Sequence, residues 1–159
     1  MLTQYNLKMP HAVYGGENAI DKLTEIIKTN GYKKVAMFTD PSFQKIGLFD
    51  IPFNAVKAAG VEYEIFNDLS IEPTYMQVQA VIERFKKSGA DFVVGCGGGS
   101  IMDAAKLASI LITDEYGVKE LLDTPGRAKK CVPIALIPTT AGSGAEVTPN
   151  AIVAVPEKA

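Results

Sequence analysis

Residues 92–106 read FVVGCGGGSIMDAAK, and this stretch decides the fold class. Its first three residues form a short uncharged run, which is typical of a strand buried on both faces of a sheet. Glycines follow at 95 and 97–99, and apolar residues from Ile101 to Leu111 then recur at helical spacing. The stretch therefore predicts a buried strand, a glycine-rich loop and a helix in direct succession, the unit that α/β domains repeat.

The same alternation extends outward from this unit over most of the chain. Glycines at 31, 60 and 89 follow apolar helical stripes and indicate helix C-termini. Residues 61–65 alternate between apolar side chains and glutamates, as in a strand exposed on one face. We expect helices near residues 19–30, 52–59, 78–88, 101–111 and 117–122, and strands near 35–38, 61–65, 92–94, 133–137 and 147–155. This order predicts an α/β fold with a mainly parallel sheet and helices on both faces.

Length and composition exclude several classes of protein. The 159 residues fit a single domain, and with 47% hydrophobic and 21% charged residues the chain resembles an average globular protein. A net charge of −2 without a long basic run argues against a nucleic-acid partner. The longest uncharged stretch, residues 131–145, contains Pro133 and Pro138 and does not predict a membrane helix. Because Lys8 and Pro10 interrupt any secretory signal, we expect a cytoplasmic protein with no membrane partner.

Metal-ligating and nucleophilic side chains are scarce. The chain has one histidine, His11, and two cysteines, Cys96 and Cys131, whereas a structural zinc site usually needs four such ligands. His11 lies in residues 5–13, which fit an N-terminal strand or hairpin, and it would have to serve any nucleophilic triad alone. In a cytoplasmic protein the two cysteines are expected to be reduced. We therefore expect this chain to supply neither a metal ligand nor a catalytic residue.

The glycine-rich loop permits two interpretations. In an open α/β sheet, ligands bind at the carboxyl ends of the strands, where this loop is expected. Glycines at 97–99 allow close approach of a ligand and positive φ angles, and the amides of the next helix favour an anion. Alternatively, Ser100 caps the helix and forms a capping box with Asp103, which leaves the three glycines unexplained. We favour a cradle for phosphate or pyrophosphate, with which capping can coexist.

A second candidate loop spans residues 138–150 and follows an expected buried strand. It contains four hydroxyl side chains, interleaved with glycine. Hydroxyls and exposed amides can hydrogen-bond phosphate, ribose or an amide group without adding charge. The alternative is an ordinary turn-rich loop with a capping box from Ser143 to Glu146, and composition alone does not decide between them.

Asp40 is a third candidate, because it ends the expected strand at 35–38. A carboxylate at this place can accept hydrogen bonds from both hydroxyls of an adenosine ribose, and its charge disfavours a 2′-phosphate. The alternative is that Asp40, which precedes Pro41, caps a helix or a turn.

The two loops together resemble the signatures of one family. Residues 95–109, GCGGGSIMDAAKLAS, resemble the GGGSxxDxxK signature of the iron-dependent (group III) alcohol dehydrogenases, and residues 137–153, IPTTAGSGAEVTPNAIV, resemble that family's PTTAGTGSE-type loop. Residues 9–20, MPHAVYGGENAI, and the turn at 39–41 also fit, so the resemblance covers residues 9–155.

This resemblance implies a Rossmann-like, doubly wound domain over residues 1–159 that binds NAD, with NADP less expected. By position, Asp40 would set the preference for NAD. Glu72 stands where the family often has Asn, so no role is carried over to it. The resemblance places the pyrophosphate at Gly97, Gly98, Gly99 and Ser100, with Asp103 nearby, and the rest of the cofactor at Thr139, Thr140, Ser143, Thr148 and Asn150.

Family members are much longer than this chain, and their helical second domain binds Fe²⁺ or Zn²⁺ through one Asp and three His. We therefore expect a fragment that binds NAD(H) weakly or moderately and has negligible turnover alone. In the intact enzyme the resemblance implies a small alcohol or aldehyde substrate and a homodimer. Two alternatives stay open, namely an enzyme like glycerol dehydrogenase or dehydroquinate synthase, and a non-catalytic nucleotide-binding module.

Overall fold

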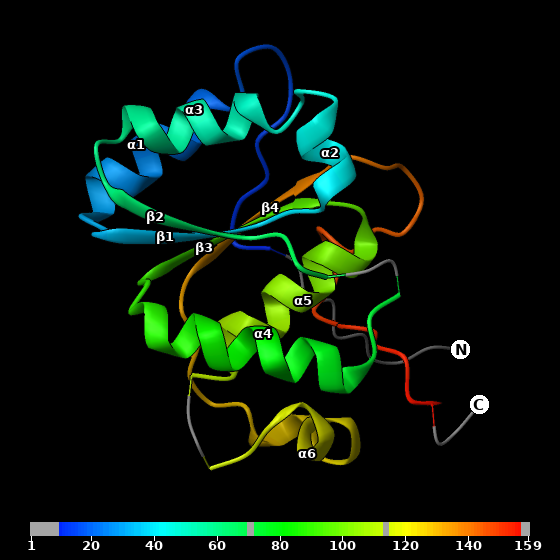
Figure 1. Ribbon diagram of the computed structural model, residues 1–159. Helices are drawn as coiled ribbons and strands as arrows, with labels where there is room; N and C mark the ends of the chain where they lie inside the picture. Colours follow the sequence, from blue (N-terminus) through cyan, green and yellow to red (C-terminus); the bar gives the residue numbers. More distant parts are fainter. Residues whose placement is uncertain (1–9, 70–71, 113–114, 157–159) are drawn as a thin grey trace, which may run out of the picture.

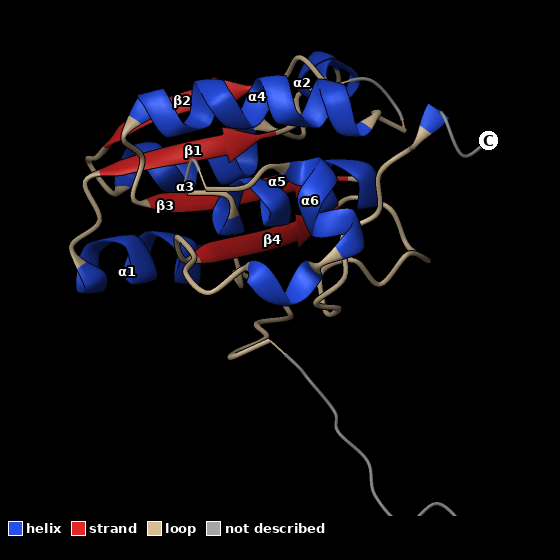
Figure 2. Ribbon diagram, turned by 90° about the horizontal axis from the view of Figure 1, so that it is seen from below, coloured by secondary structure: helices blue, strands red, loops and turns tan. Residues whose placement is uncertain are grey.

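A four-stranded parallel sheet forms the centre of the structure, a computed structural model that describes residues 10–69, 72–112 and 115–156 (Figure 1). The strands are β1 (Lys34–Phe38), β2 (Glu62–Phe66), β3 (Phe92–Gly97) and β4 (Ile134–Pro138). They lie in the order β2-β1-β3-β4 and all run in the same direction (Figure 2). β3 is buried along its whole length, as expected for a central strand covered on both faces.

Helices cover both faces of the sheet, which confirms the expected α/β fold. Figure 1 shows α1 (Asp21–Asn30), α2 (Pro41–Lys45) and α3 (Asp50–Ala58) on one face, and α4 (Tyr75–Ser88), α5 (Gly99–Ile110) and α6 (Val118–Asp123) on the other. Each face has its own apolar core. Val35 and Met37 of β1 point toward the core that includes α1 and α3, whereas Ala36 and Phe38 point toward the core of α4 and α5. This alternation follows from the two-residue period of a strand.

Glycine ends two helices where the sequence predicts it. Gly31 (φ 70°) follows α1 and Gly89 (φ 67°) follows α4, both in the left-handed conformation that glycine adopts without steric cost. Thr74 begins α4 through a capping box with Gln77. Among the described residues, no helix is long and apolar enough to cross a membrane.

The chain reverses its direction across the sheet between β1 and β3. From β1 it crosses to β2 at one edge, and it then returns to β3 on the other side of β1. Phe38 pairs with Gly95 in the register, so Asp40 follows β1 at the level of Gly97 in β3. Ligands of open α/β sheets bind at such a switch point, outside the carboxyl ends of the strands. The topology therefore brings Asp40, the glycine-rich loop and the loop after β4 together at the carboxyl ends of the strands.

Two expected strands differ from the structure. Residues 147–155 do not form one, and within the described residues this segment makes only an isolated bridge, from Ala154 to Thr74. The segment is instead held on α5 by side chains, as described below. In β2, exposure decreases from Glu62 to Phe66 rather than alternating, because Phe66 packs against Phe38 and Phe85 in the core.

The N-terminal strand or hairpin expected at residues 5–13 lies largely outside the described residues. Its described part, residues 10–13, forms no strand.

Candidate functional site

The turn from β3 into α5 exposes backbone donors at the switch point. Gly98 is the N-cap of α5, and its carbonyl accepts hydrogen bonds from the amides of Ile101 and Met102, both at 3.1 Å. The amides of Gly99 and Ser100 have no acceptor within the described part of the chain, and the first turn of α5 carries no acidic side chain. The helix start therefore presents free donors and the positive end of the helix dipole to an anion.

The capping box considered for this helix is wrong. Ser100 is the second residue of α5 rather than its N-cap, because Gly98 already has the extended backbone of a cap (φ −73°, ψ 179°). Asp103 does not reach back to the helix start. Its Oδ2 accepts a hydrogen bond from the amide of Ile152 at 3.1 Å, and its Oδ1 lies 2.8 Å from Nζ of Lys106.

The glycines of the turn provide close packing rather than positive φ angles, contrary to the sequence-based expectation. Gly95 and the three glycines at 97–99 all have negative or extended φ. A Cβ added to Gly95 would lie 2.8 Å from Cβ of Ala105, and one on Gly97 would lie 2.9 Å from Cβ of Ile101. The absence of side chains at 95 and 97 therefore lets α5 pack directly against β3, which places its N-terminus at the sheet edge.

The loop after β4 lies directly beside this helix start. The amide of its first residue, Thr139, donates to the carbonyl of the last residue of β3 at 3.0 Å. A Cβ added to Gly98 would lie 3.5 Å from Oγ1 of Thr140, and one on Gly99 would lie 3.0 Å from Oγ of Ser143. Two hydroxyl groups therefore flank the free amides, and the structure brings both candidate loops together.

The same loop is a series of turns with its hydroxyl side chains exposed. Gly142 (φ 124°) and Gly144 (φ 63°) supply the left-handed backbone that these turns require. Oγ of Ser143 accepts a hydrogen bond from the amide of Ala145 at 3.3 Å, and no helix follows. The capping box considered from Ser143 to Glu146 is therefore absent from this described loop, whose hydroxyls stay accessible to a ligand.

Asp40 caps α2, as the alternative interpretation of this residue proposes. Its Oδ1 accepts hydrogen bonds from the amide of Phe43 at 2.9 Å and from the hydroxyl of Ser42. Its Oδ2 has no hydrogen-bond donor among the described residues, so capping leaves one carboxylate oxygen for a ligand. Burial, and to a smaller extent the charge of Asp40, raises the pKa of the Cys96 thiol to about 12.

Thr148 and Asn150 are held beside the site by Lys106, which is not among the site residues expected from the sequence. Lys106 of α5 donates to the carbonyl oxygens of Thr148, at 3.3 Å, and of Asn150. A signal for Lys106 was available, because a lysine three residues after Asp103 on a helix predicts an ion pair. The side chains of Thr148 and Asn150 are exposed, so the structure places both residues beside the cleft without assigning their side chains a partner.

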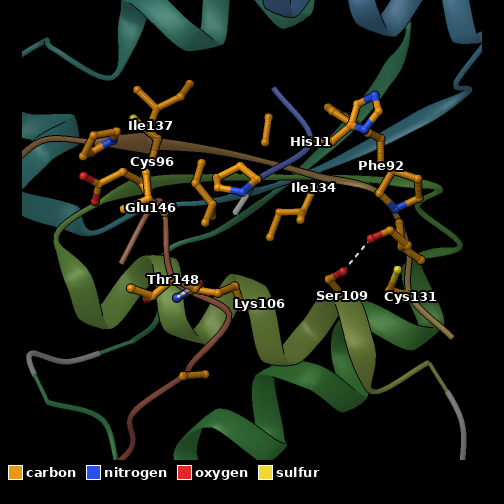
Figure 3. A pocket seen from close by; sticks show the side chains of 18 of the residues that line it. His11, Phe92, Cys96, Lys106, Ser109, Cys131, Ile134, Ile137, Glu146 and Thr148 are labelled. Carbon is orange, nitrogen blue, oxygen red and sulfur yellow. Dashed lines mark hydrogen bonds between the residues drawn. The ribbon is translucent and has the colours of Figure 1, made fainter. Parts of the chain in front are cut away.

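A half-open cavity of about 1900 Å³ adjoins the switch point and reaches both faces of β4 (Figure 3). Its lining includes Thr139 and Thr148 of the second loop, but not Asp40 or the glycines at 97–99. His11 contributes to the lining as an exposed side chain. The cavity therefore borders the proposed ligand crevice at Thr139 and Thr148, while the glycines at 97–99 and Asp40 lie outside its lining.

Both cysteines are free thiols, as expected, with Cys96 buried and Cys131 exposed. The described residues contain no group of three or more His, Cys, Asp or Glu side chains arranged to hold a metal ion. The hydrogen-bond donors at the switch point are backbone amides and hydroxyls. The nearby Lys106 contacts Asp103 and residues 148–150 instead. Such neutral donors can hold a diphosphate without a bound cation.

Comparison with known proteins supports the sequence resemblance. Residues 10–159 match the family described as iron-containing alcohol dehydrogenase. Long-chain-alcohol dehydrogenase 1 of Geobacillus thermodenitrificans is 34% identical over 142 residues, which are 87% of this chain and 36% of that protein. The chain spans between 30% and 40% of the length of the curated relatives it matches.

Solved structures agree with this match. The structure of an iron-containing alcohol dehydrogenase from Thermotoga maritima has a TM-score of 0.85 and 35% identity, covering 97% of this chain and 43% of the other. A sulfoacetaldehyde reductase from Bifidobacterium kashiwanohense, solved in complex with NAD⁺, has a TM-score of 0.77 and 29% identity, covering 93% of this chain and 39% of the other.

Proposed function

Because this chain belongs to the iron-containing alcohol dehydrogenase family, we propose that it is the NAD-binding part of an enzyme that interconverts alcohols with aldehydes or ketones. The Rossmann-like architecture is shared with solved members of the family. The activity itself, the substrate class and the choice of NAD over NADP are parts of the proposal.

The order of the donor groups along the sheet edge carries this proposal. Asp40 follows β1, the free amides of Gly99 and Ser100 follow β3, and the hydroxyls of Thr140 and Ser143 follow β4. An extended dinucleotide fits this order, with its adenosine ribose at Asp40, its diphosphate at the start of α5 and its nicotinamide half over the β4 loop.

Each group then has a separate task. Oδ2 of Asp40 accepts a hydrogen bond from the ribose and repels a 2′-phosphate. The amides of Gly99 and Ser100 donate to the diphosphate, and the hydroxyls of Thr140 and Ser143 add neutral donors beside them. Residues 148–150 border the nicotinamide half at the mouth of the cavity. When bound, the dinucleotide supplies or accepts the hydride that the alcohol or carbonyl carbon exchanges.

We assign no metal ligand to this chain. At the switch point Asp40 is a single carboxylate among amides and hydroxyls, and amides and hydroxyls are poor ligands for Fe²⁺ or Zn²⁺ compared with imidazole, thiolate and carboxylate. The groups at this site therefore suit a dinucleotide and not a metal ion. We accordingly expect the chain to bind dinucleotide and to show negligible alcohol oxidation alone.

Calorimetric titration of the chain with NADH, followed by elemental analysis for bound iron and zinc, tests the proposal. We expect saturable binding of one NADH and of one ADP, with no stoichiometric metal. Absence of binding by both nucleotides would refute a cofactor-binding role. Robust alcohol oxidation by the metal-free chain would refute the division of tasks proposed here. Homodimer formation and a cytoplasmic location, both expected from the sequence, stay predictions.

A further inference from the structure

Asp103 and Lys106 form a largely buried ion pair on α5, one turn beyond the free amides. Lys106 Nζ lies 2.8 Å from Asp103 Oδ1, and the two side chains are only 11% and 10% exposed. Other described i,i+3 ion pairs, such as Lys22 with Glu25, have more exposed partners. Desolvating two charges is costly unless their remaining hydrogen-bonding capacity is also satisfied.

The ammonium group of Lys106 faces groups of the protein itself. It donates hydrogen bonds to the carbonyl of Thr148 at 3.3 Å and to the carbonyl of Asn150. It also lies 2.8 Å from Oδ1 of Asp103 as an ion pair, without a hydrogen bond to that oxygen. Lys106 is therefore directed at α5 and residues 148–150.

The carboxylate of Asp103 also faces groups of the protein itself. Its Oδ1 faces Lys106, and its Oδ2 accepts the amide of Ile152 at 3.1 Å. The residue as a whole is 7% exposed. The sequence-based expectation placed Asp103 among the cofactor-binding residues, and in the structure its carboxylate faces Lys106 and the amide of Ile152.

All these partners belong to one segment, residues 148–152, which has no strand or helix of its own. Backbone groups that are not paired in secondary structure need other partners, and here the ion pair supplies three of them. Figure 3 shows Lys106 beside Thr148 at the wall of the cavity. The pair thus connects the helix that presents the diphosphate donors with the segment that borders the nicotinamide half.

We propose that Asp103 and Lys106 are positioning residues, which touch no part of the cofactor and hold residues 148–152 at the nicotinamide end of the cleft. This inference rests on the proposed function. It distinguishes the two ends of the dinucleotide, because ADP needs only Asp40 and the start of α5, whereas NADH also needs the β4 side. Loss of the ion pair should therefore raise the Kd for NADH far more than the Kd for ADP.

The test compares ADP and NADH binding to the full chain and to Lys106→Met, a variant of similar length without the charge. We expect the Kd for NADH to rise about tenfold and the Kd for ADP to change by less than about threefold. Hydrogen exchange at the amide of Ile152 should accelerate in the same variant, since its acceptor is no longer fixed. If Lys106→Met does not fold, Asp103→Asn offers the same comparison with a smaller perturbation.

Lys86→Met is the matched control, because Lys86 also forms an i,i+3 ion pair, with Glu83 at 3.1 Å, in the last turn of α4, at the opposite end of that helix from the residues that contact Ala154. It should change neither Kd. Equal increases of the Kd values for ADP and NADH in Lys106→Met, or no increase of either Kd, would overturn the positioning role. Failure of the unaltered chain to bind both nucleotides would instead overturn the proposed function, and this inference with it.

Discussion

Gly99, the first residue of α5, lies directly against Ser143 of the loop after β4. A Cβ added to Gly99 would be 3.0 Å from Oγ of Ser143 and 3.1 Å from its Cβ, which is closer than nearly all real Cβ contacts. The two loops that form the crevice are therefore in contact here, and a methyl group at Gly99 would require the Ser143 side chain to shift by a few tenths of an ångström. Glycine is favoured here by this close approach and not by a positive φ angle.

Gly99→Ala should weaken dinucleotide binding while changing stability little. Alanine favours a helix over glycine by about 1 kcal/mol, which offsets part of the cost of displacing the exposed Ser143 side chain. The displacement moves the β4 loop away from the free amides, and we expect the Kd for NADH to rise about tenfold. Titration calorimetry and thermal unfolding measure the two effects.

Gly126→Ala controls for the substitution itself, because no atom lies within 4 Å of a Cβ at this exposed position. It should leave both the Kd and the midpoint of thermal unfolding unchanged. Unaltered NADH binding by Gly99→Ala would show that the contact with Ser143 does not shape the binding site.

Asp40 should determine the preference for NADH over NADPH. Asp40→Gly is expected to narrow the difference between the two Kd values, because it removes the charge that repels a 2′-phosphate. Asp40→Asn separates this charge from the cap on α2, since Asn caps a helix about as well as Asp. Both variants should reduce the difference between the Kd values for NADH and NADPH to the same extent. Tighter binding of NADPH than NADH by the unaltered chain would remove Asp40 from this role.

The sequence predicts the framework of the site well because its signals are local. Gly31 and Gly89 end helices through their own backbone freedom, and the uncharged run at 92–94 is a strand because a central strand is buried on both faces. The order of strands and helices then places the candidate loops at one edge of the sheet without further information.

The details that the sequence does not predict depend on contacts between distant segments. Ser100 looks like a helix cap in the sequence, but the close packing of β3 on α5 extends the helix to Gly99 and makes Gly98 the cap. Residues 147–155 look like a strand because they are apolar, yet Lys106 and Asp103 hold their backbone instead. Neither outcome can be inferred from local propensity.

Thr39→Val should stabilise the protein. The hydroxyl of Thr39 is fully buried and has no hydrogen-bond partner within the described residues, so it is desolvated without compensation. Valine has nearly the same shape, and we expect the free energy of unfolding to rise by about 1 kcal/mol. Denaturant unfolding measures the change.

Ser109→Ala gives the opposite case, because the buried Ser109 hydroxyl donates to the carbonyl of Val132 at 2.5 Å. Its loss should lower the free energy of unfolding by about 1 kcal/mol. Destabilisation by Thr39→Val of the same size would mean that the Thr39 hydroxyl has a partner in solution.

Cys96 should make the protein less stable in alkaline solution. Burial is the main cause that raises the pKa of its thiol to about 12, whereas a cysteine in an unfolded chain titrates near about 8.5. Between these values the unfolded chain releases the proton and the folded chain retains it, so the folded state binds more protons. The free energy of unfolding should therefore fall as pH rises through this interval, by at most about 1.4 kcal/mol per pH unit from this group.

Urea unfolding from pH 8 to pH 10.5 measures this slope of the free energy of unfolding against pH. The slope should be shallower in Cys96→Ala and unchanged in Cys131→Ala, where the exposed thiol is removed. Equal slopes in the unaltered protein and Cys96→Ala would show that the thiol at the switch point ionises as readily in the folded chain as in the unfolded one.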